Sequence, residues 1–149
     1  MSSFFKKSYS AQAYINVEPD IIWQTLVNLQ EYSKWNPFTP IVKTSWKIGD
    51  KVLLTVQMKK GKKPLQQTEY LTKLNPPKEL AWGMNWEFLL KAERIQRVTE
   101  ETGGQSKYFT EDVISGFLCP LVHWLYGRHI QAGFNELALG LKNYLEDKQ

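Results

Sequence analysis

Short turns separate a series of strand-like segments in the middle of the chain, and this spacing constrains the fold more than any other feature. The segments span residues 41–46, 52–59, 65–74, 80–86, 88–99 and 106–115. Turn residues lie between them, as in Ile48-Gly49-Asp50 and Gly103-Gly104. Connections this short join antiparallel neighbours, because a parallel crossover needs a dozen or more residues. The pattern predicts an antiparallel sheet of consecutive strands.

The two ends of the chain add one further strand and the helices. Apolar and polar residues alternate over 8–16, which indicates a half-buried strand. Pro19 then begins a short helix that ends near Asn28, and a second turn passes through Tyr32. The segment 120–146 predicts one long amphipathic helix, whose apolar stripe comprises Ile130, Phe134, Leu137, Leu141 and Leu145. We therefore expect an α+β fold of about seven strands, in which the C-terminal helix packs on the sheet.

Length and composition indicate one globular domain over residues 1–149, without repeats or linkers. The aromatic fraction of 13%, with six Trp, exceeds what a core of this size needs, so some aromatic side chains are expected to line a cavity. The net charge is +4, but six lysines lie between Lys51 and Lys73, where they fit a solvated hairpin better than a nucleic-acid surface. We expect no nucleic-acid partner.

Cysteine and histidine usage argues against disulfides, metals and cofactors. Cys119 is the only cysteine, which fits a reducing compartment and a cytoplasmic location. His123 and His129 are six residues apart on one predicted helix and point in different directions, so they do not form a metal site. Neither common type of glycine-rich phosphate loop is present, and no stretch reaches the ~20 apolar residues of a membrane span.

Several motifs recur in the order known from one superfamily. They are Val17-Glu18-Pro19-Asp20-Ile21-Ile22-Trp23, Tyr32-Ser33-Lys34-Trp35-Asn36-Pro37-Phe38, Ile48-Gly49-Asp50, Leu80-Ala81-Trp82-Gly83, Gly103-Gly104 and Asp112-Val113-Ile114-Ser115-Gly116. With these motifs the chain resembles the START-like, polyketide cyclase/dehydrase-type lipid-transport superfamily (SRPBCC). The resemblance implies a helix-grip fold, in which a curved antiparallel sheet wraps the C-terminal helix and two short helices follow the first strand. Members bind lipids, hormones, quinones or polyketides, and only some are enzymes.

One departure from the family pattern concerns the last strand. The corresponding family segment usually has Glu-x-Phe-x-Gly, whereas this chain has Asp112, Ile114 and Gly116. The shorter carboxylate implies a larger pocket. Both faces of this strand carry mixed residues, and we take the face with Tyr108 and Asp112 as the inward one.

Ten residues are candidates for the walls and polar anchors of a ligand pocket. They are Trp35, Phe38, Trp82, Trp86, Glu93, Tyr108, Asp112, His123, Tyr126 and Ile130. His123 projects onto the apolar face of the predicted helix, where it is either a core residue or a polar anchor opposite Asp112 or Glu93. Trp35-Asn36-Pro37 is either a structural turn or a gate at the pocket mouth.

These observations favour binding or transport of a small hydrophobic ligand, such as a lipid, a quinone or a polyketide-like molecule, without cofactor or metal. One alternative is a cyclase- or dehydratase-type enzyme, in which His123 with Asp112 or Glu93 moves protons on the substrate. A second alternative is a co-chaperone or partner-binding module.

The beginning of the long helix predicts an exposed apolar patch. Leu118, Leu121 and Leu125 project opposite the buried stripe, beside Trp124, if the helix is continuous. Such a patch fits a homodimer contact or a transient membrane contact. Alternatively, the helix is broken at Gly127, and its first turns pack under a loop.

Overall fold

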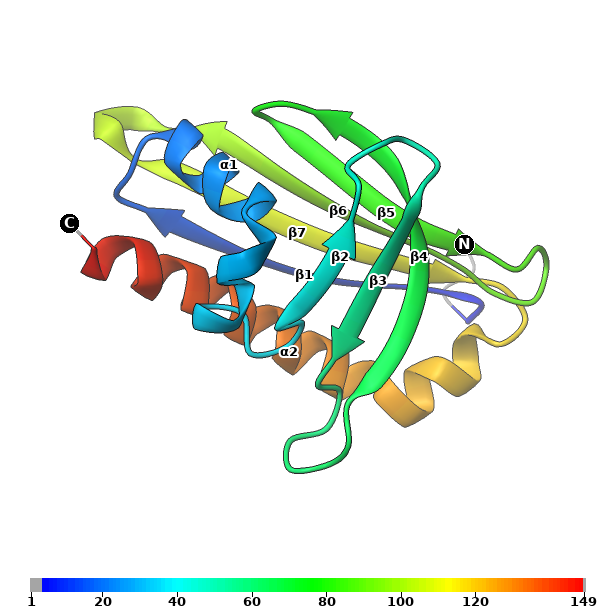
Figure 1. Ribbon diagram of the computed structural model, residues 1–149. Helices are drawn as coiled ribbons and strands as arrows, with labels where there is room; N and C mark the ends of the chain where they lie inside the picture. Colours follow the sequence, from blue (N-terminus) through cyan, green and yellow to red (C-terminus); the bar gives the residue numbers. More distant parts are fainter. Residues whose placement is uncertain (1–3, 149) are drawn as a thin grey trace.

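The computed structural model describes residues 4–148 and contains one seven-stranded antiparallel sheet with a long C-terminal helix (Figure 1). The elements are β1 (Lys6–Ile15), α1 (Pro19–Val27), η1 (Leu29–Lys34), β2 (Ile41–Thr44), β3 (Lys51–Val56), β4 (Leu65–Asn75), β5 (Glu79–Asn85), β6 (Lys91–Glu100), η2 (Thr102–Gly104), β7 (Ser106–Ser115) and α2 (Cys119–Asp147). Their order confirms the predicted helix-grip arrangement.

The strands lie in the order β1-β7-β6-β5-β4-β3-β2, and every neighbouring pair is antiparallel. Strands β2 to β7 form a meander, as the short turns predicted. β1 pairs with β7, so the first and last strands lie side by side, and β1 and β2 form the two edges of the sheet. The helices α1 and η1 carry the chain from one edge to the other (Figure 1).

The helix α2 packs against the sheet through the predicted stripe. Ile130, Phe134, Leu137, Leu141 and Leu145 are all buried, together with Ala138 and two glycines. α2 continues without interruption through Gly127, so the alternative of a broken helix is wrong. Gly127 is buried close to Tyr9 and His123, and this packing offsets the weak helix propensity of glycine.

Two further glycines of α2 receive the loop that follows η1. At Gly133 a Cβ atom would overlap the ring of Phe38, and at Gly140 it would overlap the carbonyl oxygen of Trp35. The absence of side chains at these positions lets the loop lie directly on the helix. Asn36 stabilises the loop, because its Oδ1 accepts hydrogen bonds from the backbone N–H groups of Phe38 and Thr39, at 3.1 and 2.8 Å.

Some strands are shorter than the sequence predicted, because the backbone turns earlier. β2 ends at Thr44, and Trp46 has a positive φ of 62° that takes the chain out of the strand. Similarly, β5 ends at Asn85 and Glu87 has a φ of 55°, so residues 86–90 form a hairpin loop instead of extending two strands.

Candidate functional site

A cavity of about 160 Å³ lies between α2 and the concave face of the sheet. Most of its walls are apolar side chains from the strands β3 to β7, the loops after η1, β3 and β5, and α2. The apolar lining residues are Phe38, Leu54, Val56, Met58, Leu65, Trp82, Met84, Leu90, Ala92, Ile114, Val122, Tyr126, Ile130 and Phe134. The polar lining residues are Thr39, Gln67, Glu69, Arg94 and Asp112.

Arg94 places a buried guanidinium in this apolar wall. Its Nε donates to Thr110 Oγ1 at 3.0 Å, and its Nη2 donates to Tyr108 Oη at 3.4 Å. The guanidinium carbon lies 4.9 Å from the ring centroid of Phe134 and 5.9 Å from that of Trp82. Both distances allow cation–π attraction, which favours the charged form of a side chain removed from water.

Two carboxyl groups share the cavity with Arg94. Glu69 projects from β4 and Asp112 from β7, while Arg94 lies on β6. Among residues 4–148, no carboxylate forms an ion pair within 4.0 Å of Arg94. The guanidinium therefore influences both carboxyl groups through space without neutralising either by direct contact.

Burial dominates the ionisation of both carboxyl groups. It raises the pKa of Asp112 to about 6, even though the positive charge of Arg94 acts in the opposite direction. The pKa of Glu69 rises to about 8, first through burial and then through the nearby charge of Asp112. At neutral pH the Glu69 carboxyl is therefore mainly protonated and the Asp112 carboxyl mainly ionised.

Asp112 has a buried oxygen atom without a partner. Its Oδ1 is inaccessible to solvent and accepts no hydrogen bond from any described residue. An unpartnered buried acceptor costs about 1–3 kcal/mol, so its presence calls for an explanation such as a bound molecule. This oxygen has no accessible surface toward the empty cavity, so a donor on a bound molecule reaches it only when neighbouring side chains move.

A second layer of polar side chains holds Arg94 in place. Tyr108 Oη donates to Gln96 Oε1 at 2.5 Å while it accepts from Arg94, and Thr110 Oγ1 donates to the Ile95 carbonyl at 3.1 Å. Tyr108, Thr110 and Gln96 are all buried. These hydrogen bonds fix the position of the guanidinium on the cavity wall.

Five of the ten candidate residues line the cavity. They are Phe38, Trp82, Asp112, Tyr126 and Ile130. The inward face of β7 is the one with Tyr108 and Asp112. Tyr108 itself lies beneath the cavity wall as the partner of Arg94 and Gln96.

The other four candidates lie outside the cavity, and their predicted places need correction. Trp35 is buried in the core beside Tyr32, with ring centroids 4.9 Å apart. Trp86 lies in the hairpin after β5 and is 59% exposed, because the strand ends before it. Glu93 points to the outer face of the sheet, where its Oε2 accepts from Thr72 Oγ1 at 2.8 Å.

His123 contacts β1 instead of the cavity. Its Nδ1 lies 2.6 Å from the hydroxyl of Tyr9, and the two rings stack with centroids 5.9 Å apart. The side of α2 that carries Val122 and Tyr126 faces the cavity at this level of the helix. His123 is thus exposed at the edge of the sheet and is hydrogen-bonded to a core tyrosine.

Two of the polar residues that line the cavity, Glu69 and Arg94, are not among the ten candidates predicted from the sequence. Arg94 belongs to the inward set of β6 with Ala92 and Gln96, which has no clear apolar character. Glu69 lies in a strand whose neighbouring residues are mostly polar. The sequence contains one indication that Arg94 is functional. It is a charged residue in a strand that is bounded by turn signals at both ends and is therefore central in the sheet.

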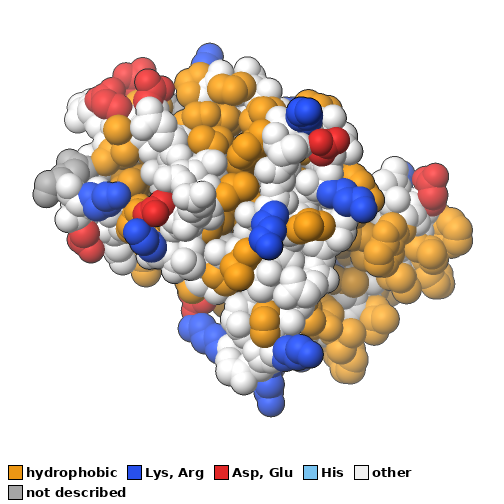
Figure 2. Space-filling model, in the orientation of Figure 1, with side chains coloured by type: hydrophobic (Ala, Val, Ile, Leu, Met, Phe, Trp, Pro, Cys, Tyr) orange, Lys and Arg blue, Asp and Glu red, His pale blue; other side chains and the backbone are white. Residues whose placement is uncertain are grey.

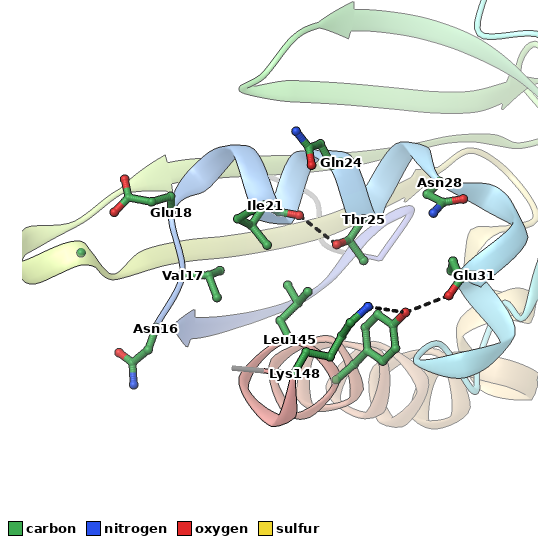
Figure 3. A pocket seen from close by; sticks show the side chains of 12 residues that line it. Asn16, Val17, Glu18, Ile21, Gln24, Thr25, Asn28, Glu31, Leu145 and Lys148 are labelled. Atoms are coloured by element: carbon green, nitrogen blue, oxygen red, sulfur yellow. Dashed lines mark hydrogen bonds between the residues drawn. The ribbon is translucent and has the colours of Figure 1, made fainter.

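A larger but more polar groove lies at the other end of the molecule, between α1 and the end of α2 (Figure 3). Its volume is about 630 Å³. Tyr144 Oη donates to Glu31 Oε1 at 2.9 Å and accepts from Lys148 Nζ at 3.3 Å across this groove. These three polar groups are already paired with one another, and the smaller cavity has the more apolar lining, so we assign the candidate site to the smaller cavity.

No family model and no curated protein matches this chain, so the comparison with known proteins rests on solved structures. A START superfamily protein from Mycobacterium smegmatis is 14% identical, with a TM-score of 0.68 over 95% of this chain and 99% of that one. The fold is START-like. Norcoclaurine synthase of Thalictrum flavum, solved as a point mutant with a transition-state analogue, shares this START-like fold. It is 12% identical, with a TM-score of 0.70 and full coverage of both chains.

The START-like fold also occurs in the two-domain ARO/CYC protein BexL of the BE-7585A biosynthetic pathway. That similarity has a TM-score of 0.69 at 9% identity and covers 94% of this chain but 46% of BexL. Over residues 4–148, no helix is long and apolar enough to cross a membrane. The same residues contain no group of three His, Cys, Asp or Glu side chains placed to hold a metal ion.

Proposed function

We propose that this chain binds a small molecule with an apolar body and one neutral polar group in the cavity under α2. The observation that carries the proposal is the convergence of Glu69, Arg94 and Asp112 on one cavity whose lining is mostly apolar. Apolar cavities with a few convergent polar groups are the usual form of small-molecule sites. START-like neighbours are consistent with this class of partner.

The cavity volume favours a ring-sized body over a long lipid. About 160 Å³ is close to the ~150 Å³ of an engineered cavity that binds benzene, and it is below the roughly 300–1,000 Å³ of most drug-sized sites. Met58 and Met84 line the cavity, and their flexible side chains allow it to widen. A quinone or polyketide-like molecule would place one ring inside and extend the remainder through the mouth.

The charges favour a neutral hydrogen-bonding group on the ligand. With Asp112 ionised and Glu69 protonated, the charge of Arg94 is balanced within the cavity. A ligand hydroxyl donates to the Asp112 carboxylate, and a ligand carbonyl accepts from Arg94 or from protonated Glu69. A phenol or a hydroxy ketone meets these requirements, whereas a saturated hydrocarbon would leave the Asp112 oxygen unpartnered.

Calorimetric titration with a panel of phenols, hydroxy ketones and matched hydrocarbons tests this proposal. We expect the hydroxylated rings to bind and Asp112→Asn to weaken their binding by about tenfold or more. Glu93→Gln is the matched control, because this carboxylate lies on the outer face of the sheet. No heat of binding across the panel, or equal weakening by both variants, would contradict the proposal.

A second candidate function is proton transfer on the bound molecule. Two carboxyl groups with raised pKa values, Glu69 and Asp112, face one apolar cavity, and one is mainly protonated while the other is mainly ionised near neutral pH. This pair takes the acid–base role that the sequence suggested for His123 with Asp112 or Glu93. Glu69→Gln should then abolish turnover of a bound cyclase- or synthase-type substrate but leave its binding measurable.

We also propose a cytoplasmic location. The lone Cys119 is buried, with its Sγ 3.3 Å from the Ile114 carbonyl, so a reducing compartment suits the chain. Fractionation of the source cells with an antibody against the chain tests this proposal, and recovery with secreted proteins would contradict it.

A further inference from the structure

An apolar patch surrounds the beginning of α2, where hydrophobic side chains gather in the space-filling view (Figure 2). The patch comprises Phe5, Trp86, Phe88, Leu89, Phe117, Leu121, Trp124 and Leu125, and each of these side chains is exposed. Trp124 is 79% exposed, Phe88 76% and Phe117 66%. Single exposed apolar residues are ordinary on protein surfaces, but a cluster of this kind marks an interaction surface.

Backbone contacts bring these residues together from three separate segments. The N–H of Phe117 donates to the carbonyl of Phe88 at 2.9 Å, and that of Gly116 donates to the carbonyl of Phe5 at 3.0 Å. The rings of Phe5 and Phe117 stack with centroids 6.4 Å apart. Leu121 and Leu125 follow at successive turns of α2, so the patch continues along the helix. It is therefore a continuous surface held by the fold.

Cationic side chains accompany the patch. The three segments 4–7, 85–91 and 116–128 contain Lys6, Lys7, Lys91 and Arg128 against a single acidic residue, Glu87. They therefore carry +3 of the net charge of +4. Lys6, Lys91 and Arg128 are exposed. An apolar surface with aromatic residues and a cationic border is the combination found in segments that bind anionic membrane interfaces.

We propose that this patch docks the protein on the surface of an anionic phospholipid bilayer. The charge distribution favours a bilayer over a second copy of the chain. In a symmetric dimer the patch would face itself, so the cationic side chains of its border would meet those of the other copy, with Glu87 and Glu93 as the acidic side chains nearby. An anionic lipid surface attracts the same border, while the exposed Trp and Phe side chains enter the headgroup region.

The patch and the cavity share the same backbone segments. Leu90, Val122 and Tyr126 line the cavity, and each directly follows a patch residue in the chain. Docking through the patch would therefore bring this wall of the cavity next to the lipid, from which apolar molecules could enter. The docking proposal stands on the surface itself and does not depend on which ligand the cavity binds.

Co-sedimentation with vesicles of phosphatidylcholine, with and without phosphatidylserine, tests the proposal on the full-length chain. We expect binding to the vesicles that contain phosphatidylserine. Replacement of Phe88, Phe117 and Trp124 together by Ser should weaken this binding by at least about a hundredfold, because each side chain loses its apolar contact with the lipid. Lys6→Gln, Lys91→Gln and Arg128→Gln should each weaken it by about fivefold, and only on the anionic vesicles.

Ile48→Ser and Leu139→Ser are matched controls, since these residues are 60% and 57% exposed but lie outside the patch. They should bind vesicles as the wild type does, and circular dichroism should show all variants folded. Absence of wild-type binding, or unchanged binding by the triple variant, would overturn the proposal. Sedimentation velocity gives the other contrary result: a wild-type dimer that the triple variant dissociates, without vesicle binding, would assign the patch to a second copy of the chain.

Discussion

Replacement of Asp112 by Asn removes an ionisable group from the cavity while it keeps the shape of the side chain. In the folded chain the pKa of Asp112 is about 6, compared with an ordinary value of 3.8. The folded state therefore binds this proton more tightly than the unfolded state, so stability is lost as the pH rises from about 4 to about 6. The difference between the two pKa values corresponds to about 3 kcal/mol. Because Asp112 is half-buried as a residue, water screens part of this penalty, and the figure is an upper limit.

Urea denaturation across this pH range measures the effect. We expect the free energy of unfolding of Asp112→Asn, relative to the wild type, to increase by up to about 3 kcal/mol between about pH 4 and about pH 7. Glu93→Gln, which removes an exposed carboxylate on the outer face, should follow the wild-type profile. Parallel profiles for Asp112→Asn and the wild type would refute the argument that this carboxyl is desolvated in the cavity.

Three further changes test other parts of the structure. Glu69→Gln should remove the loss of stability between about pH 4.5 and about pH 8 that follows from the raised pKa of this carboxyl, and the same denaturation series detects it. Gly140→Ala should lower the free energy of unfolding by about 1–3 kcal/mol, because its Cβ would overlap the Trp35 carbonyl, whereas the exposed Asn143→Ala on the same helix should not. His123→Leu should leave calorimetric ligand binding unchanged, because this ring bonds to Tyr9 outside the cavity; a changed ligand preference would contradict that assignment.

The sequence predicts the fold well because its signals are local. Turn residues between strands define the meander, and the stripe from Ile130 to Leu145 defines the buried face of α2. The same alternation cannot distinguish the two faces of β6, because Arg94 and Gln96 on the inner face are as polar as Glu93 and Arg97 on the outer face. Which face is buried depends on how the sheet packs against α2, which is distant in sequence and brings Phe134 to Arg94.

The candidate site was predicted only in part, for a related physical reason. Helical projection places His123 on the same side as Ile130, but the sheet is curved, and this end of the helix meets Tyr9 of β1. Trp86 follows the alternation of β5 but lies beyond the point where the backbone turns. Local periodicity gives the direction of a side chain relative to its own element, whereas the position of the cavity depends on how the elements pack.

The pairing of β1 with β7 has a consequence for how the chain folds. Lys6 pairs with Ser115 and Ile15 pairs with Ser106, so β1 has no neighbouring strand until β7 has formed. Contacts of such long sequence separation raise the contact order and slow folding. During synthesis, β1 leaves the ribosome long before its partner exists, and its edge stays open for association with other chains until β7 arrives. Truncation before residue 106 would leave that edge open permanently, so the folding unit extends over almost the entire chain.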